Sequence, residues 1–271
     1  MKYISQKNQT VLEALEKMAP DCSKTTLRSW LKHQRVQLDG RLVKIPTTFV
    51  SEGQVLTLGT KSQPHKIHIL YQDRHLVAIE KPAGLLSVST KYEAQKTAHS
   101  LLKEIHKPHM VYPVHRLDRE TSGVMIFALT LEARDGLKDL FEKHDIRREY
   151  EAIVEGHLDP LKGRWKSYLY EDDNYVVHSV DDPSRGKKAI THYEVLSTRK
   201  NTSHVKLSLE TGRKNQIRVH CQEAGHPIQG DKKYGPSTIP CKRLCLHATL
   251  LELKHPVTGK ELSFRSPFPM K

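Results

Sequence analysis

The polar residues best suited to chemistry lie together at 114–123. This segment reads Val-His-Arg-Leu-Asp-Arg-Glu-Thr-Ser-Gly and precedes an apolar run at 124–129. Its carboxylate, Asp118, has Arg116 and Arg119 as near neighbours in the chain. Neighbouring cations favour the ionised form of a carboxyl group, so the pattern is compatible with a nucleophilic aspartate. An ordinary surface ion pair between Asp118 and one of the arginines explains the same pattern.

A second polar cluster lies at 211–220, where a β-like run ends and a helical pattern begins. It carries Arg213, Lys214 and Arg218. The free N–H groups and the dipole of a helix N-terminus attract anions, and full positive charges strengthen that attraction. The pattern therefore predicts an anion-binding helix start, with an amphipathic helix bearing solvated cations as the alternative.

The overall charge points to a polyanionic partner. The 271 residues include 44 basic and 31 acidic side chains, for a net charge of +13 and a pI near 9.5. Such an excess suits nucleic acid or an anionic membrane surface. No apolar run approaches the roughly 18 residues of a membrane span, and residues 1–20 lack the apolar core of a secretory signal. With four scattered cysteines as well, we expect a cytoplasmic protein with no membrane partner.

The charge is unevenly distributed, which indicates two domains. Residues 1–66 hold eleven basic and five acidic side chains, so this quarter of the chain carries nearly half of the excess. A polar stretch, Lys-Ser-Gln-Pro-His-Lys at 61–66, is typical of a linker. We predict domains at 1–60 and 67–271, joined by this linker.

The N-terminal segment predicts two short helices followed by a hairpin. Apolar residues recur at helical spacing over 11–18 and 25–32, and Ser23 is a suitable N-cap for the second helix. Asp39-Gly40 lies between two short β-like runs, which is a hairpin signal. Five cations surround the junction of helix and hairpin: Arg28, Lys32, Arg35, Arg41 and Lys44. A solvated basic face is the simplest explanation of such a cluster.

The larger domain consists mainly of β-like runs. We expect strands at 67–71, 76–79, 124–129, 150–154, 190–195, 205–209 and 244–253. Two helical patterns interrupt them, at 131–144 and from Asn215 to just before Gly225. Many strands with few helices predict an α+β fold with a mixed, mainly antiparallel sheet.

The N-terminal segment resembles the alpha-L RNA-binding module that is shared with ribosomal protein S-four. The resemblance rests on Ser-Lys-x-x-Leu-Arg at 23–28, on Asp39-Gly40 between Val36 and Val43, and on Glu-Gly-Gln-Val-Leu at 52–56. Gln34-Arg35 departs from the glycine that is usual before the first strand. The resemblance implies that three of these clustered cations, Arg28, Lys32 and Arg35, contact RNA.

The larger domain resembles the RluA-type pseudouridine synthases. The most specific stretch is His-Arg-Leu-Asp-x-x-Thr-Ser-Gly at 115–123. Four further stretches follow the family's order, at 79–87, 147–152, 211–235 and 246–256. Together they span roughly residues 67–269. The resemblance implies the pseudouridine synthase fold and conversion of uridine to pseudouridine in RNA, without a cofactor or metal.

The resemblance also assigns roles to residues. Asp118 matches the catalytic aspartate, which acts either on the anomeric carbon or in removing a ribose proton. Tyr150 matches the tyrosine that packs on the target base, and Arg218 the basic partner of the aspartate. Arg116 matches the side chain that enters the RNA stack when the base is flipped out.

Further RNA contacts are expected from His115, Arg213 and Lys214. Two departures from the family pattern are Lys214-Asn215, where a small or polar residue and histidine are common, and Glu80, where asparagine or aspartate is common. We expect the first departure to tune the site, since Asn215 can still donate a hydrogen bond.

The target and the activity have alternatives. Large-subunit ribosomal RNA is the favoured target and transfer RNA the second, with no obligate protein partner and a monomer as the default. A catalytically silent RNA-binding assembly factor would show the same charge. A zinc-dependent nuclease could use Cys241, Cys245 and His247, although no second ligand pair has comparable spacing.

Overall fold

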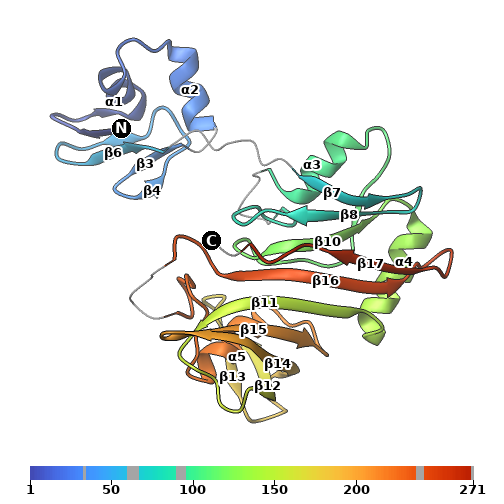
Figure 1. Ribbon diagram of the computed structural model, residues 1–271. Coiled ribbons are helices and arrows are strands. Elements are labelled where there is room, and N and C mark those ends of the chain that lie inside the picture. Colours follow the sequence, from blue (N-terminus) through green and yellow to red (C-terminus); the bar gives the residue numbers. More distant parts are fainter. Residues whose placement is uncertain (33–34, 60–66, 90–95, 236–240, 270–271) are drawn as a thin grey trace. The chain divides into compact units, whose positions relative to one another are not determined.

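A computed structural model of the protein describes residues 1–32, 35–59, 67–89, 96–235 and 241–269 (Figure 1). The chain divides into two compact units, residues 1–65 and 66–271. The linker predicted at 61–66 and Gln34 lie outside the described residues. No helix of the described chain is long and apolar enough to cross a membrane.

The N-terminal unit contains two helices and two small sheets. Its helices are α1 (Val11–Met18) and α2 (Lys24–Lys32), and its strands are β1 (Lys2–Ile4), β2 (Gln9–Thr10), β3 (Val36–Leu38), β4 (Arg41–Leu42), β5 (Phe49–Val50) and β6 (Val55–Leu58). One sheet has the order β1-β6-β3-β4, and β2 pairs with β5. The predicted N-cap is present, because the Ser23 hydroxyl accepts a hydrogen bond from the Thr26 N–H at 3.2 Å.

The predicted hairpin of this unit is also present. Asp39 and Gly40 join β3 to β4 with φ values of 48° and 80°. Positive φ at both central positions is the requirement of a type I′ turn, which Asp-Gly meets at low cost. The Asp39 carboxylate also accepts hydrogen bonds from the Val55 N–H and the Gln54 side chain, so the turn is tied to β6.

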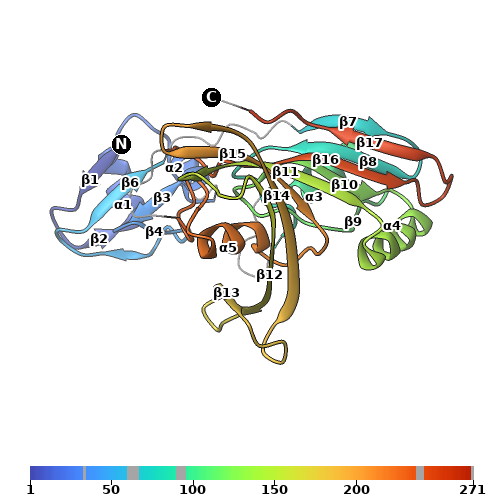
Figure 2. The same ribbon diagram turned by 60° about the horizontal axis from the view of Figure 1, so that its bottom comes forward.

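The larger unit is built on one long mixed sheet (Figures 1 and 2). Its strands are β7 (His68–Gln72), β8 (Leu76–Lys81), β9 (Tyr112–Pro113), β10 (Ser122–Ala128), β11 (Arg147–Glu155), β12 (Lys162–Glu171), β13 (Val177–Val180), β14 (Lys187–Arg199), β15 (Thr202–Leu209), β16 (Leu246–Lys254) and β17 (Glu261–Arg265). Its helices are α3 (Ala98–Ile105), α4 (Leu131–Lys143) and α5 (Gln216–Glu223).

The strand order is β13-β12-β14-β15-β11-β16-β10-β8-β7, with β17 beside β16 and β9 beside β10. Among the described strand pairs, only β10 and β16 run parallel. This pair joins the half of the sheet that contains β7, β8 and β10 to the half that contains β11 to β15. The predicted mixed, mainly antiparallel sheet and α+β class are confirmed.

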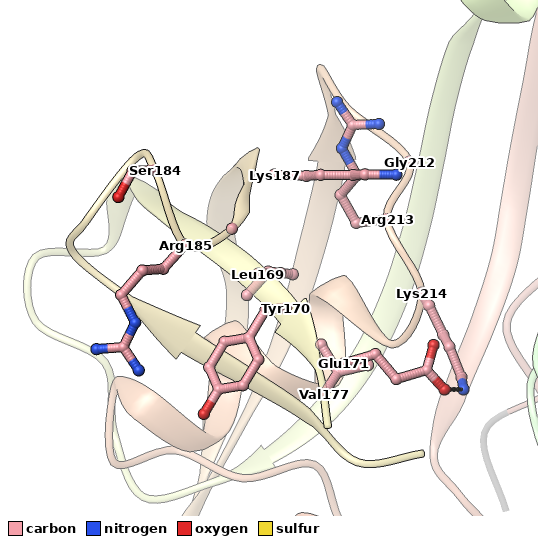
Figure 3. A pocket seen from close by; sticks show the side chains of 11 residues that line it. Leu169, Tyr170, Glu171, Val177, Ser184, Arg185, Lys187, Gly212, Arg213 and Lys214 are labelled. Atoms are coloured by element: carbon pink, nitrogen blue, oxygen red, sulfur yellow. Dashed lines mark hydrogen bonds and ion pairs between the residues drawn. The ribbon is translucent and has the colours of Figure 1, made fainter. Parts of the chain in front are cut away.

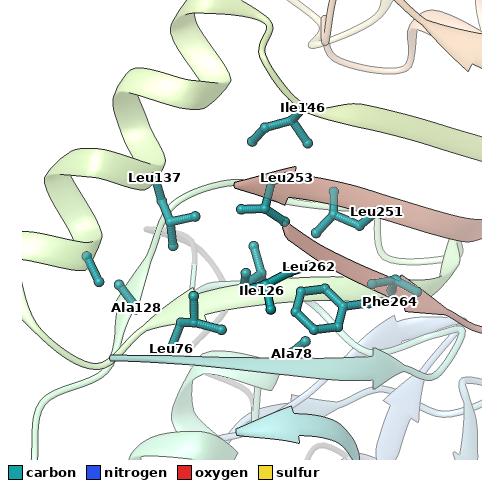
Figure 4. Packing of buried hydrophobic residues seen from close by; sticks show 12 residues of the cluster. Leu76, Ala78, Ile126, Ala128, Leu137, Ile146, Leu251, Leu253, Leu262 and Phe264 are labelled. Atoms are coloured by element: carbon teal, nitrogen blue, oxygen red, sulfur yellow. The ribbon is translucent and has the colours of Figure 1, made fainter. Parts of the chain in front are cut away.

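Strand β10 is buried on both faces, since all seven of its residues are buried. Val124, Ile126 and Ala128 face the cluster that includes Leu137 of α4 and Phe264 of β17 (Figure 4). The alternate residues of β10 join a second cluster with residues of α3. Successive strand residues point to opposite faces, so one apolar run serves both cores. Packing on both sides therefore fixes the position of β10 in the sheet.

The expected elements are all present, with small differences at their ends. Residues 244–245 do not extend β16; instead the backbone of Cys245 bonds to Gln229 and Ile153. The helix α3 was not predicted, nor were the strands β9, β12, β13 and β17 of the larger unit and β1, β2, β5 and β6 of the N-terminal unit. The strand β12 carries charged residues on its exposed face, so its sequence lacks the apolar run by which the other strands were recognised.

Gly123 is a point of close contact between β10 and β16. Its φ is +114°, and a Cβ added there would lie 2.2 Å from the Ala248 carbonyl oxygen. We expect Gly123→Ala to lower the free energy of unfolding by about 3 kcal/mol or more, because it combines backbone strain with a clash against a neighbouring strand. Urea unfolding followed by circular dichroism measures this.

Gly259→Ala is the matched control. Gly259 has a φ of +72° with no atom within 4 Å of the added Cβ, so it carries the backbone cost alone. That cost is about 1–2 kcal/mol. Equal losses in the two variants would show that the contact with Ala248 does not constrain the sheet.

Candidate active site

The loop that carries Asp118 is held from both sides by the segment at 81–87. The Ser87 hydroxyl bonds to both backbone groups of Leu117, at 2.7 Å to its carbonyl and 3.0 Å from its N–H. On the other side, Lys81 Nζ donates to the Arg119 carbonyl at 3.1 Å. Both neighbours of Asp118 in the chain are thus held in place, which restricts the direction of its side chain.

Lys81 is fully buried at the centre of these contacts. Its ammonium also donates to the carbonyls of Pro82 and Leu85, at 3.0 and 2.7 Å. Burial lowers the pKa of Lys81 to about 7. The three carbonyl acceptors favour the protonated form, because only an ammonium supplies three N–H donors. The lysine therefore joins the backbone at 82–85 to the Asp118 loop.

Arg218 of α5 lies between two carboxylates. Its Nε and Nη2 donate to the two oxygens of Asp231, each at 2.7 Å. Its Nη1 donates to Asp118 Oδ2 at 3.2 Å. Burial disfavours the charged guanidinium, but the hydrogen bonds and charges of Asp231 and Asp118 outweigh it and raise the pKa of Arg218. The arginine is held in place by Asp231 and offers one remaining nitrogen to Asp118.

Asn215 supplies the second contact to Asp118. Its side-chain NH₂ group lies 3.1 and 2.9 Å from the two oxygens of that carboxylate, and its carbonyl accepts from Tyr234 Oη at 3.0 Å. We assign this amide orientation because the opposite one would place the Asn215 carbonyl against the carboxylate. Tyr234 Oη in turn accepts from the Val177 N–H at 3.0 Å. A chain of hydrogen bonds thus directs an N–H donor at Asp118.

The start of α5 is tied to β14, which positions Asn215 and Arg218. The side chain of Gln216 donates to the Ile190 carbonyl and to Thr191 Oγ1, both at 2.9 Å. Asn215 itself adopts a left-handed backbone with a φ of 54°. Asparagine tolerates this conformation better than most residues do.

Tyr150 lies on β11 at a break in the strand register. Pairing with β16 passes from Glu149–Leu250 to Tyr150–Ala248, so one residue of β16 is skipped. Such a bulge redirects a side chain, and bulges are common beside active sites. Burial raises the pKa of Tyr150, and its hydroxyl is therefore protonated at neutral pH.

Asp118, Tyr150 and Arg218 line one cavity of about 190 Å³. Arg116 stands at the same cavity with an exposed side chain, and the turn at 212–214 forms another part of the wall. With Arg213 and Lys214 in that turn, the structure brings together six of the predicted residues from separate parts of the chain.

The other predicted contacts in this unit have more varied positions. Arg213 and Lys214 lie at the cavity, where Arg213 Nε donates to the Lys188 carbonyl. His115 instead packs on Phe141, and its Nε2 accepts a hydrogen bond from the backbone of β10 at 3.0 Å. Burial lowers the pKa of His115 to about 3, so this ring is neutral at physiological pH.

Several residues that support the site had no role assigned from the sequence. Asp231, Tyr234 and Lys81 were noted only as parts of motifs. Arg148 was not singled out: its guanidinium is buried, and two of its nitrogens have no hydrogen-bond partner in the described chain. The position of Asp231 within the motif at 211–235 marked it as a residue of interest. The sequence alone, however, does not show which arginine it contacts.

The residues of the alternative zinc site have other partners. His247 Nδ1 lies 2.8 Å from the Ser122 hydroxyl, and its Nε2 lies 2.9 Å from the Ser266 hydroxyl. Cys241 lies against the Gln229 side chain. Within the described ranges, no group of three or more potential ligands is placed to hold a metal ion.

The Asp231–Arg218 pair makes a stability prediction. We expect Asp231→Asn to lower the free energy of unfolding by about 3–5 kcal/mol, because it leaves a buried guanidinium without its main partner. Burial alone would raise the pKa of Asp231, but the hydrogen bonds and charge of Arg218 hold it below the ordinary 3.8. This stabilisation is present above pH 3.8 and is lost as the pH falls further, so the difference between wild type and variant should shrink in acid.

Urea titrations from neutral to acidic pH measure both effects. Asp135→Asn is the control, since Asp135 pairs with Arg134 on an exposed helix surface and should change stability little. A difference between wild type and Asp231→Asn that stays constant with pH would contradict the assigned ion pair.

Comparison with known proteins shows the family to which the chain belongs. Residues 75–223 match the family described as RNA pseudouridylate synthase. The chain is 33% identical to ribosomal large subunit pseudouridine synthase D of Vibrio cholerae, over 98% of this chain and 89% of the relative. The enzyme of that name from Escherichia coli K12 is 31% identical over the same shares.

Solved structures show the same fold. Human RNA pseudouridylate synthase domain containing 4 has a TM-score of 0.62 at 29% identity, covering 74% of this chain and 88% of that one. Human RNA pseudouridylate synthase domain containing 1 has a TM-score of 0.66 at 22% identity, covering 77% and 86%. The predicted pseudouridine synthase fold is therefore confirmed, and the chain belongs to the RNA pseudouridylate synthase family as an RNA pseudouridine synthase.

Proposed function

We propose that this enzyme converts uridine to pseudouridine in large-subunit ribosomal RNA, with Asp118 as its catalytic residue. Relatives with 31–33% identity along nearly the whole chain carry the name of ribosomal large subunit pseudouridine synthases. Transfer RNA is the second candidate target, and mapping the modified positions distinguishes the two.

The observation that carries the proposal is the position of the Asp118 carboxylate. It lies in a small cavity, is about a quarter exposed, and receives N–H donors from Arg218 and Asn215. These donors fix the orientation of the carboxylate, and a positioned carboxylate can act as a nucleophile or as a base. The two short hydrogen bonds of Arg218 go to Asp231, so the Asp118 carboxylate is oriented without being fully neutralised.

The reaction needs both a carboxylate and a surface that holds the base. The carbon–nitrogen bond between ribose and uracil breaks, the base rotates, and a carbon–carbon bond forms at the same ribose carbon. The proton on the new ring carbon is lost, and the freed ring nitrogen gains one. Asp118 would act on the anomeric carbon or remove a ribose proton. Tyr150, which lines the same cavity, would pack on the uracil during rotation.

Rotation requires that the base leave its stack. Unstacking costs a few kcal/mol, and it costs least in loops. Arg116 is exposed at the cavity, so its guanidinium would fill the space that the uridine vacates in the RNA. Its planar group can stack on neighbouring bases.

Asp118→Asn tests the catalytic assignment. We expect loss of pseudouridine formation with nearly unchanged RNA affinity, because the amide keeps the shape of the carboxylate but supplies neither a nucleophile nor a base. Carbodiimide-stop sequencing of RNA from cells with each variant would map the product, and filter binding would measure affinity. A variant that modifies RNA at the wild-type rate would falsify this role.

We propose that the N-terminal unit is an alpha-L RNA-binding module. Arg28 and Lys32 lie on α2 with exposed side chains. Arg35 stacks on Trp30 with its guanidinium 5.3 Å from the ring, and it donates twice to the Gly59 carbonyl. These contacts order Arg35 near the end of α2, and phosphate groups are the expected ligands of such a cluster of cations.

Deletion of residues 1–60 tests this assignment. We expect weaker binding to structured ribosomal RNA and a shallower dependence of affinity on salt, because the lost cations no longer release counterions. Turnover of a short RNA fragment should persist, since the Asp118 cavity lies within the second unit. Unchanged affinity and salt slope would remove the RNA-binding role.

A further inference from the structure

A second cavity shares part of its wall with the Asp118 cavity. It has a volume of about 610 Å³ and is formed by β12, the start of β14 with the residues before it, and the turn at 212–214 (Figure 3). Gly212, Arg213 and Lys214 line both cavities. A volume of this size falls in the range of about 300–1,000 Å³ that is usual for ligand sites. We call it the basic cavity.

The charge of the basic cavity is strongly positive. Four cations line it, Arg185, Lys187, Arg213 and Lys214, against one carboxylate, Glu171. Lys214 pairs with that carboxylate. In the part of the chain that the structure describes, neither Arg185 nor Lys187 forms an ion pair. The cavity therefore has three cations beyond its internal pair, which suits a phosphate.

Arg213 and Lys187 both line the cavity, and Arg213 is bonded to the backbone of Lys188, the residue after Lys187, whereas Glu171 pairs with Lys214 (Figure 3). Arg213 is ordered before any ligand binds, because its Nε donates to the Lys188 carbonyl at 3.0 Å. A phosphate is consequently expected at the edge formed by Arg213 and Lys187, where the carboxylate repels it least.

The remaining wall suits a nucleobase. The Tyr170 ring is half-buried, with the Arg185 guanidinium 6.0 Å from its centroid. His178 stacks on this ring with a centroid distance of 5.4 Å and holds it in place. Buried Leu169 and Val177 add apolar surface. Unpaired RNA bases commonly stack on tyrosine rings and arginine planes.

We propose that the basic cavity binds the nucleotide next to the target uridine. Its phosphate lies at Lys187 and Arg213, and its base packs against Tyr170 and Arg185. This inference rests on the proposed function, because the target uridine defines what is next to it. The shared turn at 212–214 favours a neighbour in the same strand, since an RNA chain that leaves the Asp118 cavity over this turn enters the basic cavity directly.

The test combines single changes in the RNA with single changes in the protein. The RNA is a ribosomal stem–loop containing the uridine mapped by sequencing. One nucleotide at a time, on either side of the uridine, is made abasic or given a neutral methylphosphonate. At one position, removal of the base should lower the affinity of the wild-type protein for the RNA by at least about fivefold. The neutral linkage at that position should lower the affinity by about tenfold.

The protein variants should remove these sensitivities separately. Tyr170→Ala should bind the abasic and the normal RNA equally while still responding to the methylphosphonate. Lys187→Ala should show the reverse. Lys138→Ala, at an exposed lysine on α4, is the control for lost charge and should keep both responses. Matching thermal melting curves would establish that all the variants fold.

Two outcomes would overturn the proposal. In the first, the wild type shows no sensitive position, and in the second, Lys138→Ala loses the same response as Lys187→Ala. If the first outcome is accompanied by binding of uridine monophosphate to the wild type and not to Lys187→Ala, the ligand of the cavity is a free nucleotide.

Failure of the proposed function gives a different result. In that case no RNA gains pseudouridine with the wild-type protein. The affinity scan needs no turnover, so it can be repeated with stem–loops from an unmodified large-subunit transcript. It then tests nucleotide binding in the basic cavity independently of catalysis.

Discussion

One mostly buried arginine shared by two carboxylates holds the site together. Arg218 has two short hydrogen bonds to Asp231 and one longer contact to Asp118. Asp231 also accepts from the N–H groups of Lys233 and Tyr234, so it anchors the guanidinium. Asp118 is oriented by N–H donors from Arg218 and Asn215, yet its oxygens keep lone pairs for chemistry. An equal division of the hydrogen bonds would bind the Asp118 carboxylate more tightly and leave it less reactive.

The sheet brings the other parts of the site to this arginine. Ala248 of β16 pairs with Gly123 on one side and with Tyr150 on the other. One strand therefore aligns the end of the Asp118 loop with the tyrosine that shares its cavity. The glycine permits the close approach of β10 to β16, and the bulge on the other side sets the direction of Tyr150. Small changes in strand pairing would consequently displace the side chains that line the Asp118 cavity.

The positive charge of the chain serves different purposes in different places. Lys81 is buried and Arg218 is mostly buried, and both act on the site through carboxylates and carbonyls of the protein itself. Arg116 and the cations of the basic cavity have accessible side chains that a polyanion can reach. The turn at 212–214 lines both the Asp118 cavity and the basic cavity. Net charge does not separate these roles, because burial decides which cations a ligand can contact.

Apolar periodicity, a property of the chain itself, was enough to predict the α+β fold. The reaction class and the set of Asp118, Tyr150 and Arg218 were predicted from the resemblance of ordered motifs to a known family. Neither the periodicity nor the motifs predicted that Asp231 anchors Arg218, that Lys81 holds the Asp118 loop, or that the ring of His115 is neutral. Each of these depends on residues far apart in the sequence. Burial and hydrogen-bond geometry exist only once β8, β10, β11 and β16 meet in one sheet, and so the folded chain alone decides them.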